Sequence, residues 1–381
     1  MLITVLLFFL CGAVAVRRYK SFSSGKGLWD CVKSVDMSVF DSRRDRSGLY
    51  SNIKTFIRED SEKMKRIGLL GCGRISKRHI EAITSTDGVE IACVCDKNEE
   101  KAKAAGELLG VPYVTDYREL NGRGLDVISV LTPSGLHPRH VANIAEQTDA
   151  PYIVCEKPLS LTVREAYEVF RRVEKAGKTL LPVYQNRYNP LVKLMKELIS
   201  SGKLGRIHQF ICNVLWNRND EYFAIDWHGT AEFDGGVLYT QASHYVDMVH
   251  FFFGEVESYK GMGSDMRGFD VYDSVSAVLR FKSGTVGTIN ATVDVYQTNY
   301  QTEFTLIAEK GTIRLSGTNL NQIDFWNVEG MEKPDLDFKI DHQYGKGHNT
   351  MYEYIAQDKF EMFPSKADIL SGIRLMEMLS Y

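Results

Sequence analysis

The sequence predicts an α/β Rossmann domain followed by an α+β domain with a large, mainly antiparallel sheet. From Lys65 to about Gln185, continuous apolar stretches alternate with amphipathic stretches of helical period. That alternation is typical of a parallel sheet covered by helices on both faces. Beyond Gln185 a helix is followed by apolar runs joined by short turns, which favours antiparallel hairpins. With 381 residues, 44% of them hydrophobic, the chain is long enough to form two cores.

The first domain is expected to contain six parallel strands with helices between them. Each expected strand is a short apolar run, and each expected helix repeats apolar residues three and four positions apart. The strands are expected at residues 65–70, 89–96, 111–115, 125–132, 152–158 and 179–185, and the helices at residues 75–83, 98–109, 138–147 and 162–177.

The second domain is expected to begin with a helix at residues 190–202 and a strand at residues 206–216. Two later stretches, residues 274–295 and 301–317, have the pattern of hairpins. Their turns are expected at Ser283-Gly284 and Lys310-Gly311. We place the boundary between the two domains after residue 186.

Residues 1–63 precede the first domain and are expected to carry no chemistry. Residues 1–16 are apolar and are followed by Arg17 and Arg18. This run is shorter than the ~20 residues that span a bilayer. Residues 17–63 are polar and mixed in charge, as in a linker. The sequence leaves open whether this extension is a membrane anchor, a signal sequence or the product of an upstream start.

The composition argues against several classes of function. Lys and Arg total 46 against 49 Asp and Glu, and the basic residues are interspersed with acids, so no surface for nucleic acid is indicated. The seven cysteines are scattered and include no CxxC pair, which argues against a metal cage or a disulfide framework. Reduced thiols favour a cytoplasmic protein, with an N-terminal membrane anchor as the alternative.

A glycine-rich turn at residues 71–76, GCGRIS, indicates a dinucleotide site because it follows a strand and opens a helix. Gly71 permits the tight turn, and Gly73 lets a pyrophosphate approach the N–H groups of the helix N-terminus. Ser76 replaces the usual third Gly or Ala and is also small. Asp96 ends the second strand about twenty residues later, where a carboxylate binds the adenosine ribose. The negative charge of Asp96 repels the 2'-phosphate of NADP and so favours NAD. The positive charge of the neighbouring Lys97 would instead favour NADP.

Polar residues also follow the fourth and fifth strands, at the carboxyl edge of the sheet where ligands of such folds bind. Thr132, Pro133 and His137 follow the fourth strand, although a histidine here is also typical of a cap or a surface group. Lys157 ends the fifth strand, and Pro158 biases it toward an extended backbone. A lysine that is partly desolvated near a cationic nicotinamide has a lowered pKa and can exchange protons with a substrate hydroxyl. The alternative is a solvated loop lysine.

A histidine far downstream is a second candidate for proton transfer. Residues 234–254 contain a Gly-Gly turn and then an apparent helix, with His244 in its first turns. Asp247 and Met248 lie three and four positions later, on the same helix face. Taken alone, the local sequence favours a histidine that belongs to the core.

Together these motifs resemble the glucose-fructose oxidoreductase, inositol dehydrogenase and MocA (Gfo/Idh/MocA) family. The resemblance covers roughly Met64 to the C-terminus and rests on the order of the GCGRIS turn, Asp96, TPSGLH, CEKP, YQNRYNP and GGVLYTQASHYVD. It implies that residues 64–186 form an NAD-binding Rossmann domain and that residues 187–381 form a domain for substrate binding and oligomerisation. A homodimer or homotetramer is expected through the open antiparallel sheet.

The resemblance also implies site residues, with Lys157 and His244 beside the reacting carbon and no metal. The expected NAD-binding residues are Gly71, Gly73, Arg74, Ile75, Ser76, Asp96, Thr132, Pro133, His137, Glu156, Lys157 and Gln185. The expected substrate-binding residues are Lys157, Arg187, Tyr188, Arg218, Tyr222, Trp227, Thr240, Gln241 and His244.

One departure from the family pattern helps to choose a branch. Many sugar and inositol dehydrogenases of the family carry an Asp four residues before the histidine, and this chain has Thr240 there. The stretches TQASHYVD and VLWNRNDEYFAIDWHGT look most like the dehydrogenases that oxidise C3 of UDP-N-acetylglucosamine or its uronic acid. Arg187 and Arg218 would then bind anionic groups of the substrate, and Tyr222 and Trp227 would stack on it or simply pack.

Two other functions fit the same pattern of residues. The first is a dehydrogenase of a free sugar or inositol, which belongs to the same family. The second is a non-catalytic NAD-binding sensor, because one fold serves many functions.

Overall fold

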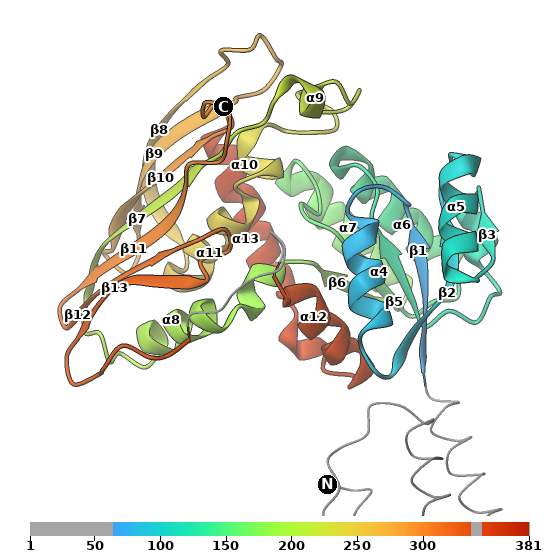
Figure 1. Cartoon of the computed structure of the whole chain (residues 1–381), viewed down its shortest axis with the longest axis horizontal. Coiled ribbons are helices and arrows are strands. Elements are labelled where there is room, and N and C mark those ends of the chain that lie inside the picture. Colours follow the sequence, from blue (N-terminus) through green and yellow to red (C-terminus); the bar gives the residue numbers. More distant parts are fainter. Residues whose placement is uncertain (1–63, 337–344, 381) are drawn as a thin grey trace, which may run out of the picture. The chain divides into compact units, whose positions relative to one another are not determined.

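The computed structural model describes residues 64–336 and 345–380 (Figure 1). The predicted N-terminal extension, residues 1–63, lies outside the described residues. Within the described part, the chain forms no helix with the length and apolar character needed to cross a membrane.

The first sheet is parallel, has six strands and follows the order β3-β2-β1-β4-β5-β6. The order reverses between β1 and β4, so the carboxyl ends of these strands open a crevice suited to a ligand. The strands are β1 (Lys65–Leu70), β2 (Val89–Cys95), β3 (Tyr113–Val114), β4 (Val127–Val130), β5 (Tyr152–Cys155) and β6 (Thr179–Pro182).

The helices between these strands begin and end where the sequence supplies caps. The Asn98 side chain accepts a hydrogen bond from the Lys101 N–H at the start of α5, and Gly110 ends this helix with a φ of +67°. Thr162 caps α7 in the same way as Asn98 caps α5. The elements are α4 (Ser76–Thr84), α5 (Glu99–Leu109), α6 (His137–Gln147), α7 (Val163–Lys175), η2 (Tyr117–Leu120) and η3 (Ser134–Leu136).

The second sheet has seven strands in the order β13-β12-β11-β7-β10-β9-β8. Neighbouring strands are antiparallel except β7 and β10, which are parallel. This topology confirms the predicted Rossmann domain with a second, mainly antiparallel sheet, and both predicted hairpins are present. The strands are β7 (Ile207–Leu215), β8 (Val256–Ser264), β9 (Ser274–Phe281), β10 (Val286–Thr292), β11 (Gln301–Ala308), β12 (Gly311–Ser316) and β13 (Gln322–Val328).

Helices cover one side of the second sheet, where α10, α11 and α13 lie (Figure 1). Residues of β9 alternate between buried and exposed, as expected for a sheet with one covered face. The remaining elements are η4 (Gln185–Tyr188), α8 (Pro190–Ser200), α9 (Asp220–Phe223), α10 (Val237–Thr240), α11 (Ser243–Phe253), α12 (Gly347–Ala356), η5 (Phe360–Met362) and α13 (Lys366–Leu379).

Helix α12 follows the second sheet in the chain but packs on the first domain, beside α4 (Figure 1). Tyr352 and Ile355 are fully buried in one apolar cluster with Ile67 and Ile83. The Asn349 side chain also donates a hydrogen bond to Ser85 Oγ, at the end of α4. The division at residue 186 stays a prediction, and this packing shows that a segment of the second predicted domain completes the core of the first.

Candidate functional site

The glycine turn has the shape that a dinucleotide requires. Gly71 has a φ of +108°, and a Cβ there would lie 2.8 Å from Leu131 O, so a larger residue is excluded. A Cβ at Gly73 would meet no atom within 4 Å, which leaves the backbone approachable at this point. The N-cap of α4 is Ile75, which makes no side-chain capping hydrogen bond, so first-turn N–H groups can bind a phosphate. The residues present therefore fit a dinucleotide.

Asp96 lies directly after β2 and is held against the glycine turn. Its carboxylate accepts hydrogen bonds from the Cys72 N–H at 2.8 Å and from the Asn98 N–H at 2.9 Å. A carboxylate has about four lone-pair sites, so two ribose hydroxyls can still be accommodated. Ser76 Oγ donates to Gly73 O at 2.6 Å and closes the turn from the other side.

At the carboxyl edge of the first sheet, hydrogen bonds of His137 hold together the turns that follow β4 and β5. Its Nδ1 lies 2.7 Å from Pro158 O, and its Nε2 lies 2.7 Å from Thr132 O. Burial lowers the pKa of His137, and the hydrogen bonds to the two carbonyl groups oppose that effect. Because both ring nitrogens are occupied, His137 holds the Thr132-Pro133 turn in place rather than offering a free nitrogen to NAD. Thr132 Oγ1 lies 2.9 Å from His140 Nδ1.

Lys157 reaches from the end of β5 to the second domain. Its Nζ donates a hydrogen bond to the main-chain oxygen of Thr240 at 2.9 Å, and the Lys157-Pro158 peptide bond is cis. Burial lowers the pKa of Lys157, and the Glu156 carboxylate partly offsets this by raising it. Two segments that are far apart in the sequence therefore meet at this ammonium group.

His244 is the second residue of α11 and is buried beside Lys157. The glycine turn before α10 makes this approach possible, since Gly236 has a φ of +89° and a Cβ there would lie 2.7 Å from Tyr272 O. His244 Nε2 lies 3.0 Å from Gln185 Nε2, and among the described residues His244 Nδ1 has no hydrogen-bond partner. Burial and the nearby Lys157 hold the pKa of His244 well below its usual value, so the ring is neutral at pH 7.

A cationic and aromatic cluster adjoins Thr240. Arg218 Nη2 donates to Gln241 Oε1 at 2.5 Å, and Gln241 Nε2 donates to the Tyr222 hydroxyl at 2.8 Å. The Arg218 guanidinium lies 5.5 Å from the centre of the Tyr222 ring. Tyr222, Thr240 and Gln241 line one pocket, and the Arg218 charge is close enough to lower the pKa of Lys157.

His228 and Asp234 extend this cluster, although no motif in the sequence predicted a role for either residue. The His228 ring stacks on Tyr222 and lies against Trp227, with both pairs of ring centres 3.8 Å apart. His228 Nδ1 lies 3.1 Å from Asp234 Oδ2, and Asp234 Oδ1 accepts a hydrogen bond from the Gly236 N–H. The position of Asp234 immediately before the Gly-Gly turn was the available signal in the sequence.

The structure places Arg187 in an internal ion pair and not at a substrate-binding surface. Its Nε and Nη2 donate to the two carboxylate oxygens of Asp247 at 2.8 Å and 2.7 Å, and its Nη1 lies 3.5 Å from Asp368 Oδ2. Burial would lower the pKa of Arg187, but Asp247 more than offsets this and raises it. With its donors occupied by protein carboxylates, Arg187 does not fit the predicted role of substrate ligand.

Tyr188 likewise belongs to the core and not to the pocket. Its ring packs edge-on against Tyr354 and Phe363, with ring centres 5.4 Å and 6.4 Å apart. These partners lie in and after α12, on the side of the first domain. Arg187 and Tyr188 therefore both lie in internal contacts, and their binding to substrate stays a prediction.

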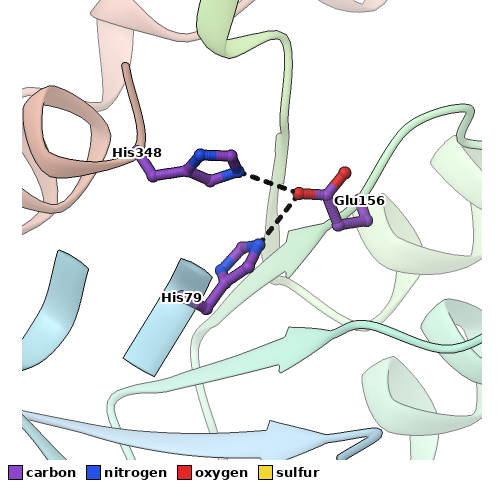
Figure 2. Close-up of side chains that lie close together, drawn as sticks. All are labelled: His79, Glu156 and His348. Atoms are coloured by element: carbon purple, nitrogen blue, oxygen red, sulfur yellow. Dashed lines mark hydrogen bonds and ion pairs between the residues drawn. The ribbon is translucent and has the colours of Figure 1, made fainter. Parts of the chain in front are cut away.

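His79, Glu156 and His348 form a buried group next to Lys157, and Figure 2 shows their three side chains pointing toward one another. One carboxylate oxygen, Glu156 Oε1, lies 2.9 Å from His79 Nε2 and 3.2 Å from His348 Nε2. The other oxygen accepts the Lys157 N–H at 3.1 Å. Burial raises the pKa of Glu156, but the hydrogen bonds from the two histidines hold it well below its usual value. These residue types can also bind a metal ion, and their donor atoms all lie within 4.8 Å of one another.

Comparison with known proteins gives a consistent result for both halves of the described chain. Residues 65–184 match a family model described as an oxidoreductase family with an NAD-binding Rossmann fold. Residues 192–314 match the model of the GFO/IDH/MocA C-terminal domain.

Three individual proteins illustrate the range of similarity. The crystal structure of the WlbA dehydrogenase from Bordetella pertussis in complex with NADH and UDP-GlcNAcA has 33% identity and a TM-score of 0.75, and the match covers 83% of this chain and 94% of that chain. Myo-inositol 2-dehydrogenase of Thermotoga maritima is 27% identical over 257 residues, 65% of this chain and 74% of that protein. The oxidoreductase YrbE of Bacillus subtilis (strain 168) is 29% identical over 189 residues, 49% of this chain and only 53% of that protein.

Replacing Asp96 tests the cofactor site. Asp96→Ala should weaken NADH binding roughly ten- to a hundredfold, because a charged hydrogen bond contributes about 1.5–3 kcal/mol. Asp96→Asn keeps an acceptor for the Cys72 N–H but removes the charge, so it should mainly improve NADPH binding. Fluorescence titration with NADH and NADPH measures both, with Glu100→Ala in the exposed first turn of α5 as control. An unchanged ratio of the two affinities in both variants would contradict this assignment.

Removing one partner of the Arg187–Asp247 pair should cost stability. Asp247→Ala should lower the free energy of unfolding by about 3–5 kcal/mol, because the buried Arg187 charge loses its two hydrogen bonds to a carboxylate and keeps only the more distant Asp368. Arg171→Ala is the matched control, since the Arg171–Glu168 pair is about half exposed and contributes ~0–1 kcal/mol. Urea unfolding measures both. If Arg187→Met instead kept wild-type stability and raised only the KM of the substrate, Arg187 would be a substrate ligand after all.

Proposed function

The chain belongs to the Gfo/Idh/MocA oxidoreductase family, and on that premise we propose that it oxidises C3 of UDP-N-acetylglucosamine or of its uronic acid with NAD. The observation that carries this proposal is the meeting of Lys157 with the Thr240–His244 segment at the carboxyl edge of the NAD-binding domain. Burial lowers the pKa of Lys157 toward neutral pH, as proton exchange by a lysine requires, and keeps the His244 ring neutral, so that it can accept a proton.

Two features support a nucleotide sugar as the substrate. The first is the likeness to the WlbA dehydrogenase, whose crystal structure contains NADH and UDP-GlcNAcA. The second is the Arg218–Gln241–Tyr222 cluster next to Thr240, which combines a guanidinium with an aromatic ring. A guanidinium matches the geometry of phosphate and carboxylate groups. An aromatic ring can stack on a nucleobase or on a sugar ring.

The side chains of the site would divide the proton transfer between them. The neutral His244 ring or the Lys157 amine takes the proton of the hydroxyl group, and the other group donates a hydrogen bond to the oxygen of the forming ketone. The Thr240 carbonyl orients Lys157 Nζ, and the Gln185 amide orients the His244 ring. Positioned proton transfer of this kind contributes about 10²- to 10⁴-fold to the rate.

The glycine turn and Asp96 would hold NAD, which when bound supplies the acceptor for the hydride that leaves the sugar carbon. Gly73 and the N-terminus of α4 would receive the pyrophosphate, and Asp96 would receive the ribose hydroxyls. The exposed Arg74 contributes a further positive charge at this end of the site, where it also acts on Lys157.

A free sugar or inositol is the second candidate substrate. The similarity to myo-inositol 2-dehydrogenase favours it. Such a substrate would need only hydrogen-bonding groups and would leave the Arg218 cation without a partner on the substrate. The sensor alternative predicts that Lys157 and His244 are dispensable, which the variants below test.

Self-association through the second sheet is also part of this proposal. The side of that sheet away from α11 and α13 exposes the apolar side chains of Val278 in β9 and Phe325 in β13, which are both 49% exposed. A sheet face that no helix covers is a surface on which the sheets of two subunits can pack face to face. We propose a homodimer or homotetramer that buries them.

Turnover with a nucleotide sugar tests the catalytic pair. With UDP-N-acetylglucosamine or its uronic acid, the protein should form NADH, in a single turnover if NADH stays bound. Lys157→Met and His244→Ala should each bind NAD normally and lose about 10²- to 10⁴-fold in kcat, and the double variant should lose little more than the worse single variant. Lys178→Met is the matched control, because Lys178 is also partly buried and donates to main-chain oxygens. If no sugar is oxidised and Lys157→Met has no effect in any of these assays, this proposal is wrong and the protein is a non-catalytic NAD-binding sensor.

Arg218→Ala separates the two substrate classes. It should raise the KM for the nucleotide sugar about ten- to a hundredfold, as for a lost charged hydrogen bond of about 1.5–3 kcal/mol, with a small effect on kcat. Steady-state kinetics on a nucleotide sugar and on myo-inositol measure this difference, with the exposed Arg206→Ala as control. Preference for myo-inositol or glucose in the unaltered protein would reject the nucleotide sugar and leave the family assignment intact.

A further inference from the structure

The start of α12 touches the supports of both candidate catalytic side chains. His348, the second residue of the helix, contacts Glu156, and the Glu156 carboxylate accepts the Lys157 N–H. Gly347, the first residue, lies against Gln185, and the Gln185 amide contacts the His244 ring. Two adjacent residues almost two hundred positions after Lys157 thus reach both halves of the site through one intermediate each.

The contact at Gly347 leaves no room for a side chain. A Cβ at this position would lie 2.4 Å from Gln185 O and 2.8 Å from Gln185 Cβ. Real Cβ atoms do not approach backbone atoms this closely, so either α12 or η4 would have to move. Gln185 is itself buried, and a shift there would displace the group that faces His244 Nε2.

The contact at His348 is part of a closed network of buried polar groups. His79 Nδ1 lies 2.7 Å from the Tyr352 hydroxyl, and that hydroxyl lies 3.1 Å from Ser129 Oγ. Tyr352 lies one turn after His348 in α12, so the helix reaches Glu156 both directly and through His79. Figure 2 shows the two histidines approaching one oxygen of Glu156 from two different elements. The second oxygen is left for the Lys157 main chain.

We propose that Gly347 and His348 position the catalytic pair, with His348 holding Lys157 through Glu156 and Gly347 holding His244 through Gln185. This inference rests on the proposed function only in naming Lys157 and His244 as the groups that transfer protons. Neither Gly347 nor His348 is proposed to contact substrate.

The charge of Glu156 gives the proposal a measurable electrostatic consequence. The titratable groups that interact with Glu156 are Cys155, Lys157, His79, His137, His244, His348, Tyr184 and Tyr352. Glu156 and Asp234 raise the pKa of Lys157, whereas Arg218 and Arg74 lower it. Neutralising Glu156 should therefore lower the pKa of Lys157.

A metal ion in the His79–Glu156–His348 group is the competing explanation. The short contacts are those of hydrogen bonds from ring N–H groups to a carboxylate, and they account for the low pKa of Glu156 without an ion. Elemental analysis of the purified protein decides between the two. Stoichiometric zinc or another divalent metal, removed by a chelator together with activity, would overturn the positioning proposal.

Variants at His348 test whether this residue holds Lys157 in place through Glu156. His348→Leu should lower kcat on the order of a hundredfold, as for a small misplacement of a reacting group, with little change in KM or in the Kd for NADH. Loss of one hydrogen bond raises the pKa of Glu156, so the fall in kcat on acidification should begin at a higher pH than in the wild type. His348→Gln restores an N–H donor and should recover most of both properties. His250→Leu, which removes a helix histidine near Asp368, is the control.

Gly347→Ala tests, in the same assays, whether Gly347 holds His244 in place through Gln185. It should lower kcat with unchanged NADH affinity, whereas Gly372→Ala in α13, where a Cβ has ordinary room, should not. Wild-type kcat and an unshifted acid limb in both His348→Leu and Gly347→Ala would overturn the proposal. Should His348→Leu fail to fold, Gly347→Ala and the following titration still decide.

A titration that needs no substrate separates this inference from the proposed function. The rate of acetylation of Lys157 by acetic anhydride, followed by peptide mass spectrometry against pH, reports the pKa of its amine. Glu156→Gln should lower that pKa by about one unit or more, because a nearby opposite charge typically shifts a pKa by 1–3 units. Lys178 in the same sample is the internal control. An unchanged pKa of Lys157 would overturn the link from Glu156 to Lys157 on which the His348 part of the inference depends, even if the protein oxidises UDP-sugars. The expected shift would support that link even if the substrate is another sugar.

Discussion

The carboxylate of Glu156 is buried and ionised, and the surrounding structure is arranged to make that state stable. An isolated charge in a protein interior costs several kcal/mol, and only excellent hydrogen bonding offsets this cost. Here the donors come from α4, from α12 and from the main chain of Lys157. The carboxylate therefore ties the end of β5 to two helices that the sequence separates widely. The rigidity of the Lys157 turn follows from this arrangement as much as from Pro158.

With Thr240 in place of the Asp that many family members carry, the site lacks one negative charge but keeps a hydrogen-bond acceptor for Lys157. The Lys157 ammonium meets the main-chain oxygen of Thr240 and not a side-chain carboxylate. A carbonyl dipole orients the amine but adds no full negative charge, so burial prevails and the pKa of Lys157 is lowered. A main-chain acceptor is also insensitive to the side chain at that position. The departure from the family pattern is therefore compatible with proton transfer by Lys157 and His244.

Local patterns in the sequence predicted the features that depend on local geometry. The GCGRIS turn, the strand and helix order of the first domain and both hairpins of the second follow from periodicity and turn chemistry. Strands β8 and β13 were not predicted. In β8 every residue is exposed or half-buried, so no apolar alternation marks it. The internal ion pair of Arg187 was not predicted, because an arginine near a site has the same sequence signature whether it faces a ligand or an internal carboxylate such as Asp247. The partners of Glu156 were missed because His79 and His348 acquire meaning only when α12 folds back onto α4.

That return of α12 has a consequence for the order in which the protein can fold on the ribosome. The apolar cluster that contains Ile67, Leu69 and Val94 is completed by Met351, Tyr352, Ile355 and Phe363. All strands of the first sheet have been synthesised by residue 182, but the residues that cover this cluster emerge only after the entire second sheet. Until those residues are synthesised, the nascent first domain therefore exposes an apolar surface, as folding intermediates do. Its protection during synthesis depends on the last tenth of the chain.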